Sequence, residues 1–555
     1  MKKMKYGILA LLACSTMTLT GCFNLDEEPY SEITEESFIP TEQDAAALMA
    51  PAYGKLTYIF DWQGLFDTQE EPGDIIITPT RPNGWDDGGT YRRMHQHEWD
   101  NQQWQPWNCY ITPLGAINTV NRVKAQLDED ALPVGDLKEP MIAELRALRA
   151  LWYSMLLDTH GNVPIVDTWT DELPKQATRQ EVYNFVVKEL TEALPNLSDA
   201  NDGTTYGRMN KWAALACLTR VYLNAEVYTG TAQWAKVVET ADQIINSGIF
   251  ELAPDYSDNF AVDMDYSNNK EVIFAVPYDM QYAAFGQQHK WYPPVANNHF
   301  GNFKDYFWGG SCANPQFINA YEPGDKRLEK TWLTGKRYHY QNPEEVVWEC
   351  INYLPSLTCM RDGENNTNIN WGYRVGKYEY NYETTTGQWS NDFAYFRYAE
   401  ILMSKAEALL RQGKDEDVAA QLVSQIRARV FDDAAQATVT AADLKADTRI
   451  QYGTLDWDNN IDELGDQTPV VLGGLYDEWG FEFACEAQRR TQMIRFGTFT
   501  TKNWFNHKPV GDHVIIFPIP LEELQTNGNL KQNPGDYSEV PTQLTWKNNL
   551  LLRNG

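Results

Sequence analysis

The feature that most constrains the fold is a long run with small and apolar residues at helical spacing. The stretch "NKWAALACLTRVYLNAEVYTGTAQWAKVVETADQIINSG" predicts a helix from about Lys211 to Tyr228, a turn, and a second helix that ends at Gly248. Glycine is a common helix stop because it adopts the left-handed conformation without strain. The stretch therefore predicts a helical hairpin.

Two further regions have the same pattern. In "FRYAEILMSKAEALLRQGKDEDVAAQLVSQIRARV" one apolar stripe runs up to a break at Gly413, and "EPMIAELRALRALWYSMLLDTHGNVPIV" with "TRQEVYNFVVKELTEALPNL" forms a third pair. Alanines at this spacing let paired helices approach closely, as in tetratricopeptide repeats. Since the repeat is degenerate, we expect tetratricopeptide-like hairpins and not a regular solenoid.

Two aromatic-rich stretches interrupt the helices, at about residues 66–108 and 254–393, and are dense in Gly, Asn, Asp, Trp and Tyr. They predict loops and short strands, and "NKEVIFAVPYD" is the clearest strand because Val272, Phe274 and Val276 alternate with their neighbours. The expected fold is mostly α, with a helical scaffold at about 41–253 and 394–555 in a single domain spanning 41–555. Function tends to concentrate in such insertions.

Composition excludes some partners and points to others. With 43% hydrophobic residues the chain can bury a large core, and a formal net charge of -31 argues against nucleic acid or an anionic lipid surface as a partner. The 19 Trp and 30 Tyr are unusual, since many lie in polar stretches and not in periodic apolar ones. Some of these rings should face solvent or a ligand.

The N-terminus has the layout of an export signal. Three lysines in Met1 to Lys5 precede an apolar run to Leu19, which is shorter than the roughly 20 residues of a membrane-spanning helix. Leu19-Thr20-Gly21-Cys22 resembles a bacterial lipoprotein cleavage box, so residues 1–21 are the expected signal peptide and Cys22 the expected lipidated N-terminus. Residues 22–40 would form an acidic tether. The alternative is an ordinary secreted protein with an incidental cysteine.

Five stretches, in order along nearly the whole chain, resemble the SusD/RagB family of surface glycan-binding lipoproteins. They are the box at Cys22, "ELRALRALWYSMLLDTHGNVPIV", "YGRMNKWAALACLTRVYLNAEVYTG", "FRYAEILMSKAEALL", and the pair "EFACEAQRRTQMIRFG" with "IFPIPLEELQTNGNLKQNPG". The last pair is the most specific, although Ala487, Gln488 and Gln492 depart from the family pattern. The resemblance implies a SusD-like fold, an outer-membrane location at the cell surface and a SusC-like TonB-dependent transporter as partner.

Glycan binding requires flat apolar faces for sugar rings and planar polar groups for hydroxyls. The N-terminal insertion offers Trp85, Trp99, Trp104 and Trp107 among Arg81, Asp86, Asp87, Arg92 and Asn101. The central insertion offers Trp291, Tyr292 and Trp308 among Asn297, Asn298 and Asp305. The family resemblance implies that aromatics of both insertions build the site, with Trp99 and Trp308 as the first candidates and Tyr292 next. The alternative for each ring is packing against the helices.

The C-terminal motif is better interpreted as scaffold than as site. Glu482, Arg489, Arg490 and Arg495 are predicted to lie on one helix, where three- and four-residue spacing permits ion pairs.

Catalytic and metal signals are weak. The 77 acidic residues make chance carboxylate pairs inevitable, and no spacing singles out an acid and a nucleophile for glycoside hydrolysis. His95 and His97 could point to one side of a strand and bind zinc with a third ligand, and Asp263, Asp265 and Glu271 are candidates for a structural calcium site. No catalytic residue and no cofactor other than this calcium is predicted.

The sequence thus predicts a non-enzymatic glycan-binding lipoprotein that captures oligo- or polysaccharide and presents it to a transporter. Two alternatives are a glycoside hydrolase on a helical scaffold and a helical-repeat adaptor whose aromatics pack or meet protein partners.

Overall fold

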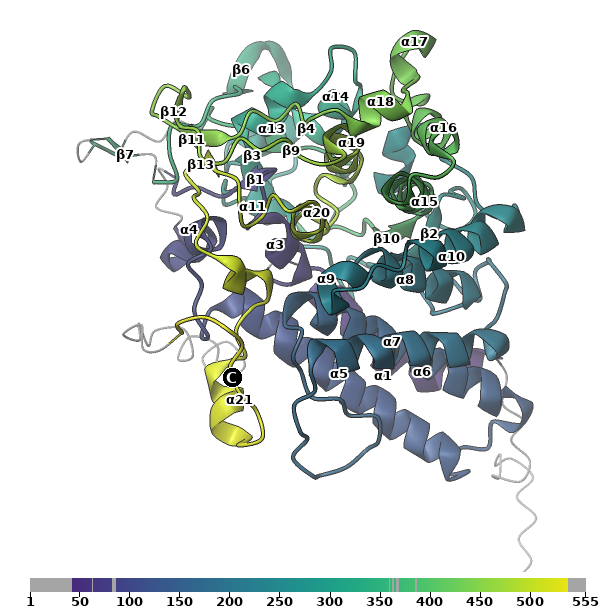
Figure 1. The fold of residues 1–555 in the computed structure, drawn as a ribbon. Coiled ribbons are helices and arrows are strands. Elements are labelled where there is room, and N and C mark those ends of the chain that lie inside the picture. The colour runs from purple at the N-terminus through teal and green to yellow at the C-terminus, as the bar shows by residue number, and fades with distance from the viewer. Residues whose placement is uncertain are drawn as a thin grey trace, which may run out of the picture.

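The computed structural model describes residues 42–61, 63–81, 86–358, 360–361, 364–365, 369–384 and 387–537. These residues form a mostly helical body with short strands and irregular segments at one end, which confirms the predicted fold class (Figure 1). The predicted signal peptide and tether, Cys22 and Trp85 lie outside the described residues. In the described ranges, no helix has the length and apolar character needed to cross a membrane.

The N-terminal half supplies most of the scaffold. Its helices are α1 (Glu42–Tyr53), α2 (Leu56–Ile59), α3 (Leu65–Glu70), α4 (Thr90–Gln96), α5 (Trp104–Asp128), α6 (Lys138–Thr159), α7 (Arg179–Ala193), α8 (Lys211–Leu223), α9 (Ala225–Thr229) and α10 (Trp234–Ser247). Helix α5 packs on α6 and α6 on α7, and the stack continues through α8, α10, α15 (Tyr398–Gln412) and α16 (Glu416–Arg427). Helices α5, α6 and α7 run side by side in the lower part of Figure 1.

The central predicted hairpin is confirmed, with one difference. The Asn210 side chain caps α8 by accepting a hydrogen bond from Ala213 N at 2.9 Å, and Gly248 closes α10 in the left-handed conformation at φ 67°. The first helix ends earlier than predicted, at Leu223, and the short α9 follows it. The alanines that marked the pattern are buried between helices, so this spacing sets how closely they pack.

The N-terminal insertion is more helical than predicted. It contains α3, a 3₁₀ turn η1 (Asp87–Gly89), α4 and the first turn of α5, together with strand β1 (Ile76–Ile77). Phe66 and Met94 are fully buried, so packing against the core stabilises helices in a stretch whose composition predicted loops. The expectation of loops and short strands for residues 66–108 therefore missed these helices, although the short strand β1 is present.

The central insertion begins and ends in one two-stranded sheet. Its elements are η4 (Tyr256–Phe260), β2 (Val272–Val276), α11 (Gln288–Trp291), α12 (Ala296–Phe300), β3 (Cys312–Ala313), α13 (Pro315–Ala320), α14 (Arg327–Thr331), β4 (Trp332–Leu333), β5 (Gly335–His339), β6 (Asn342–Cys350), β7 (Met360–Arg361), β8 (Glu364–Asn365), β9 (Arg374–Val375) and β10 (Phe393–Arg397). The predicted strand β2 is confirmed and pairs antiparallel with β10, with Val276 opposite Phe393. Both ends of the insertion thus start from one place on the scaffold.

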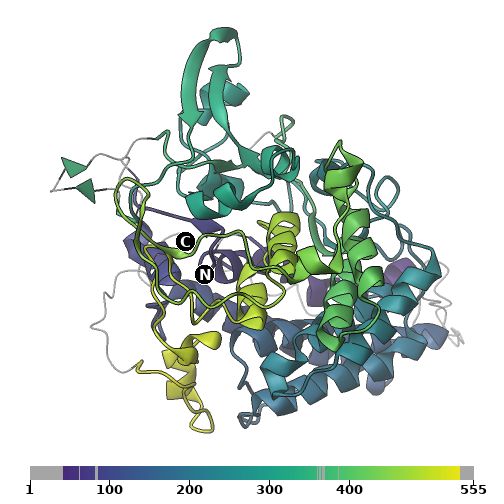
Figure 2. The same cartoon turned by 45° about the horizontal axis from the view of Figure 1, so that its top comes forward.

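Two other pairings position the insertion. Strand β1 pairs antiparallel with β3, which ties the N-terminal insertion to the central one. Strands β5 and β6 form a hairpin that stands out from the body at the top of Figure 2, and β4 pairs with β9 beneath it.

The C-terminal part completes the body. After α15 and α16 come α17 (Ala434–Ala437), α18 (Ala441–Lys445), β11 (Gly453–Leu455), β12 (Ile461–Glu463), α19 (Gly473–Phe483), α20 (Arg489–Phe496), β13 (Trp504–Phe505), the 3₁₀ turn η5 (Asp512–Ile515) and α21 (Leu521–Thr526). Strand β11 lies between β12, which is antiparallel to it, and β13, which is parallel to it.

The motif that was predicted as one helix is broken in two. Glu482 ends up on α19 and the three arginines on α20, because Cys485 and Ala487 adopt positive φ values of 64° and 58° between the helices. The arginines do not pair along their own helix. Arg489 binds Asp74 at 2.6 Å, Arg490 binds Asp158 at 3.2 Å and Arg495 binds Glu407 at 2.8 Å. The motif is scaffold, as predicted, but it acts between distant segments.

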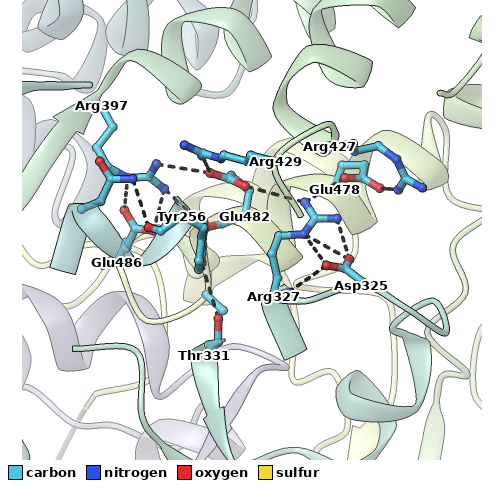
Figure 3. Close-up of polar contacts among 12 residues, drawn as sticks. Tyr256, Asp325, Arg327, Thr331, Arg397, Arg427, Arg429, Glu478, Glu482 and Glu486 are labelled. Atoms are coloured by element: carbon cyan, nitrogen blue, oxygen red, sulfur yellow. Dashed lines mark hydrogen bonds and ion pairs between the residues drawn. The ribbon is translucent and has the colours of Figure 1, made fainter. Parts of the chain in front are cut away.

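A buried ion cluster joins the insertion, the α15–α16 hairpin and α19 (Figure 3). Its cations are Arg327, Lys377, Arg397, Arg427 and Arg429, and its anions are Glu271, Asp325, Glu478, Glu482 and Glu486. The named cations and anions are equal in number, so each buried charge can be compensated by an opposite one. Burial alone would raise the pKa of Glu271, but Arg429 and Arg397 outweigh it and hold that pKa at about 2.

Candidate functional site

Exposed aromatic side chains gather in the central insertion. In the described part of the chain, Phe303, Tyr306, Tyr338, Tyr340 and Tyr382 have exposed fractions from 42% for Tyr338 to 74% for Tyr306. The half-buried Trp308 follows Tyr306 closely in the same loop. We call these six residues the aromatic platform. Exposure of so many rings in one insertion requires an explanation other than core packing.

Three chain segments bring the platform together. Tyr340 N, just after β5, donates to Asn298 O on α12 at 3.0 Å, and the Phe303 and Tyr340 rings lie 6.0 Å apart. Tyr382, from the segment before β10, lies 6.5 Å from the Phe300 ring at the end of α12. The platform is therefore built around α12 by residues 296–308, the β5–β6 hairpin and residues 380–384.

Glycine lets the Tyr340 ring lie flat against the loop. Gly301 has φ 74°, and a Cβ at this position would lie 2.6 Å from Tyr340 Cδ2. A side chain here would be strained and would displace the ring.

The loop that carries the platform is pinned by Asp305. The Tyr380 hydroxyl donates to the Asp305 carboxylate, and Asn297 Nδ2 donates to the Asp305 carbonyl at 2.9 Å. Burial raises the pKa of Asp305 to about 6, and the same burial together with Asp305 raises the pKa of Tyr380. This carboxylate is engaged in holding the fold, which argues against a role as a catalytic acid.

A buried lysine anchors the same loop to the N-terminal insertion. Lys290 Nζ binds the carboxylates of Asp67 and Glu71 beside α3, the latter at 2.7 Å, and all three side chains are fully buried. The Lys290 carbonyl accepts from Gly310 N at 2.8 Å, and His289 O accepts from Trp308 N at 2.7 Å. Burial is the main cause of a raised Glu71 pKa, although Lys290 opposes it. The pinned loop presents a preorganised surface.

Four predicted ligand contacts are buried: Trp99, Trp291, Tyr292 and Arg81. Trp99 packs its ring 4.7 Å from Phe517, and Trp291 stacks 5.4 Å from Tyr378. The Arg81 guanidinium donates to Gly310 O and Trp371 O, so it holds the platform loop from its buried side. The prediction that these side chains contact a glycan at the surface is contradicted by their burial.

Trp104, Asn101 and Asp86 lie apart from the platform. Trp104 is half-buried and its ring stacks 4.8 Å from that of Trp107 at the start of α5. This segment lies near α21, since the Asn101 carbonyl accepts a hydrogen bond from Leu521 N at 2.9 Å. Asp86 accepts from Thr80 Oγ1 at 2.6 Å and pairs with Arg92 at 3.0 Å. Figure 1 places α21 in the lower part of the view and strand β6 of the β5–β6 hairpin at its top. Among the predicted aromatic residues that the structure describes, only Trp308 belongs to the platform, and the polar candidates Asn297, Asn298 and Asp305 lie in the segment around α12 that carries it.

The metal-site candidates are engaged otherwise. Asp265 Oδ1 accepts from Ser267 N at 2.7 Å, and Glu271 is held in the ion cluster by Arg397 and Arg429. In the residues described, no group of three His, Cys, Asp or Glu side chains could hold a metal ion. His95 lies on α4 and not on a strand, and both His95 and His97 are buried among aromatic rings.

Five platform residues were missed by sequence reasoning: Phe303, Tyr306, Tyr338, Tyr340 and Tyr382. A local signal existed, because "GNFKDY" places Phe303 and Tyr306 between polar residues, whereas the buried pair in "KWYPP" is followed by two prolines. In "KRYHYQN" the tyrosines alternate with polar residues, as on the exposed face of a strand.

Comparison with known proteins places the chain in a family. A family model described as "SusD family" matches residues 270–515, and one described as "Starch-binding associating with outer membrane" matches residues 25–223. The chain belongs to the SusD/RagB family. The starch-binding protein SusD of Bacteroides thetaiotaomicron is 24% identical over 442 residues, which are 71% of this chain and 72% of that protein.

Solved structures show the same fold. A SusD superfamily protein from Parabacteroides distasonis has a TM-score of 0.68 and 20% identity, covering 90% of this chain and 100% of that one. The surface glycan-binding protein A from Bacteroides thetaiotaomicron, solved with laminarihexaose, has a TM-score of 0.65 and 17% identity, covering 89% of this chain and 100% of that one. The SusD-like fold predicted from the sequence motifs is confirmed.

Proposed function

We propose that this protein captures an oligo- or polysaccharide on the aromatic platform at the cell surface. The observation that carries the proposal is the set of exposed rings that three separate segments bring together on a pinned loop. Aromatic faces bind the C–H surfaces of sugar rings at little cost in side-chain entropy. A starch-binding relative and a structural neighbour solved with laminarihexaose support this class of ligand.

The captured glycan would pass to a SusC-like TonB-dependent transporter in the outer membrane, with acylated Cys22 as the anchor. This step rests on family membership and on the lipoprotein box at Leu19–Cys22. A matching family model whose description includes association with the outer membrane supports this location.

Binding without catalysis is the proposed activity. Asp305, the carboxylate of the platform loop, accepts a hydrogen bond from Tyr380 and is buried, so it does not reach a scissile bond at the surface. Incubation with the bound polysaccharide should release no new reducing ends. Turnover would favour the glycoside hydrolase alternative.

Calorimetric titration of residues 30–555 with plant, fungal and host polysaccharides tests the proposal. We expect saturable binding to one of them, weakened about tenfold, or about 1.4 kcal/mol, in each of Phe303→Ala, Tyr340→Ala and Trp308→Ala. Trp169→Ala is the matched control, because Trp169 is 59% exposed but lies in the loop after α6. If the three platform variants bind like the wild type, the platform is not the site.

A further inference from the structure

A second hollow lies away from the platform, between α10, the end of α15 and the segment that leads into α19. Its volume is about 640 Å³, and Trp234, Leu410 and Leu472 form much of its apolar wall. Ligand sites in proteins commonly have volumes of about 300–1,000 Å³. No platform residue lines it, so it is a separate cavity that we call the α10–α15 cleft.

One wall of the α10–α15 cleft is held rigidly. Val470 N donates to Asp447 Oδ1 at 2.8 Å, and Gly474 N donates to Ala446 O at 3.0 Å. Leu472 has a φ of 58°, a left-handed conformation that is strained for a leucine. Such strain persists only where the surroundings enforce it, and it clusters at binding and active sites. The cleft is therefore preformed.

The opposite wall presents a fixed aromatic face. Trp234 is half-buried at the start of α10, and the Arg411 guanidinium lies 5.2 Å from the centre of its ring. Arg411 Nε donates to Glu407 Oε1 at 2.8 Å, which orients the guanidinium and with it the indole. A ring held in this way can stack on a ligand with little loss of side-chain entropy.

The charged groups around the cleft favour a neutral ligand. Glu226 and Asp447 contribute two negative charges, and Arg411 and Lys445 contribute two positive charges. Arg411 is paired with Glu407 and Lys445 with Glu416, so the cleft offers both donors and acceptors without a net attraction for an anion. An apolar face beside both donors and acceptors for the hydroxyl groups of a sugar suits a sugar ring. We propose that the α10–α15 cleft is a second binding site, which takes a neutral saccharide unit independently of the platform.

Ligand-observed saturation-transfer NMR tests this proposal. Binding at the platform is first weakened with Phe303→Ala and Tyr340→Ala together. The probes are glucose, galactose, mannose, xylose and N-acetylglucosamine, each at millimolar concentration. We expect saturation transfer to at least one probe. Adding Val471→Trp should reduce that signal about tenfold, because Val471 is 73% exposed and lines the cleft, so the indole fills it without disturbing the core.

The matched control is Val510→Trp, since Val510 is 42% exposed and does not line the cleft. It should leave the signal unchanged. The proposal is overturned if none of the five sugars receives saturation transfer, or if the signal survives Val471→Trp. Stronger transfer to glucuronate than to glucose would overturn the neutral assignment. Because Val471→Trp changes the cleft and leaves the remaining platform rings untouched, the result is independent of the calorimetric test.

Discussion

At the scale of single residues, Tyr292 and Tyr340 illustrate what decides the role of an aromatic side chain. Both lie in polar, aromatic-rich stretches of the same insertion. Tyr292 packs 5.2 Å from Phe307 and 5.3 Å from Phe300, and is buried. Tyr340 lies at the end of an exposed strand and rests on Gly301. Residue type alone therefore predicts a ligand contact no better than it predicts core packing.

Three buried histidines provide a prediction at this scale. His97 and His507 lie 4.1 Å apart by ring centroids, and His95 lies 6.2 Å from His507. Burial lowers the pKa of His95 and of His97 from 6.5 to about 3, and lowers the pKa of His507 well below 6.5. Unfolded histidine takes up a proton below about pH 6.5, whereas the folded state stays neutral. Above pH 6.5 these histidines do not lower the free energy of unfolding. Below pH 6.5 they lower it progressively as the pH falls towards 3.

His95→Phe removes one of the three titrations and keeps an aromatic ring in the core. We expect the loss of unfolding free energy between pH 6.5 and pH 5 to shrink by about 1.4 kcal/mol per pH unit relative to the wild type. Urea denaturation at each pH measures this loss. His339→Gln, at a half-buried position on β5, serves as the control and should leave the slope unchanged. An unchanged slope in His95→Phe would contradict the assignment.

At the scale of elements, the platform loop depends on a contact from another part of the chain. Lys290 lies on α11, whereas Asp67 lies on α3 and Glu71 directly follows it, so the anchor spans the two insertions. Two carboxylates and one ammonium share this buried site, and removal of the cation leaves both carboxylates unpaired.

Lys290→Met should therefore destabilise the protein by about 3–5 kcal/mol and weaken glycan binding, because the loop bearing Trp308 loses its anchor. Chemical denaturation and calorimetry measure the two effects. Lys304→Met, an exposed lysine of the same loop, is the matched control for stability. Adding Asp67→Asn and Glu71→Gln to Lys290→Met should recover part of the stability, since the buried charges are gone. Equal denaturation midpoints for Lys290→Met and Lys304→Met would rule out the anchor.

At the scale of the whole molecule, the proposed role requires the body to stay at the cell surface. Cys22 is proposed to carry the acyl chains, and each buried methylene contributes about 0.8 kcal/mol to membrane binding. In Figure 1, helices α5, α6 and α7 lie in the lower part of the body and strand β6 of the β5–β6 hairpin lies at its top. Such an arrangement suits a binder that is tethered and not embedded.

Cys22→Ser should shift the protein from the membrane fraction to the soluble fraction and abolish the acylated N-terminal peptide in mass spectrometry. Cys14→Ser, inside the apolar leader, is the control and should leave both unchanged. Retention of Cys22→Ser in the membrane fraction, with no acyl mass on the wild-type peptide, would favour the ordinary secreted protein considered in the sequence analysis.

The sequence by itself determined the helical hairpins, the stop at Gly248, strand β2 and the family, because these depend on local spacing and on motifs that are contiguous in the chain. It did not determine which aromatics reach solvent. Trp291 and Tyr292 are buried and Phe303, Tyr340 and Tyr382 are exposed because distant segments pack around α12, whereas Trp99 is buried against Phe517 from the C-terminal part of the chain. Such contacts depend on long-range pairing, which leaves no periodic trace in the sequence, so only the tertiary structure decided where the candidate site lies.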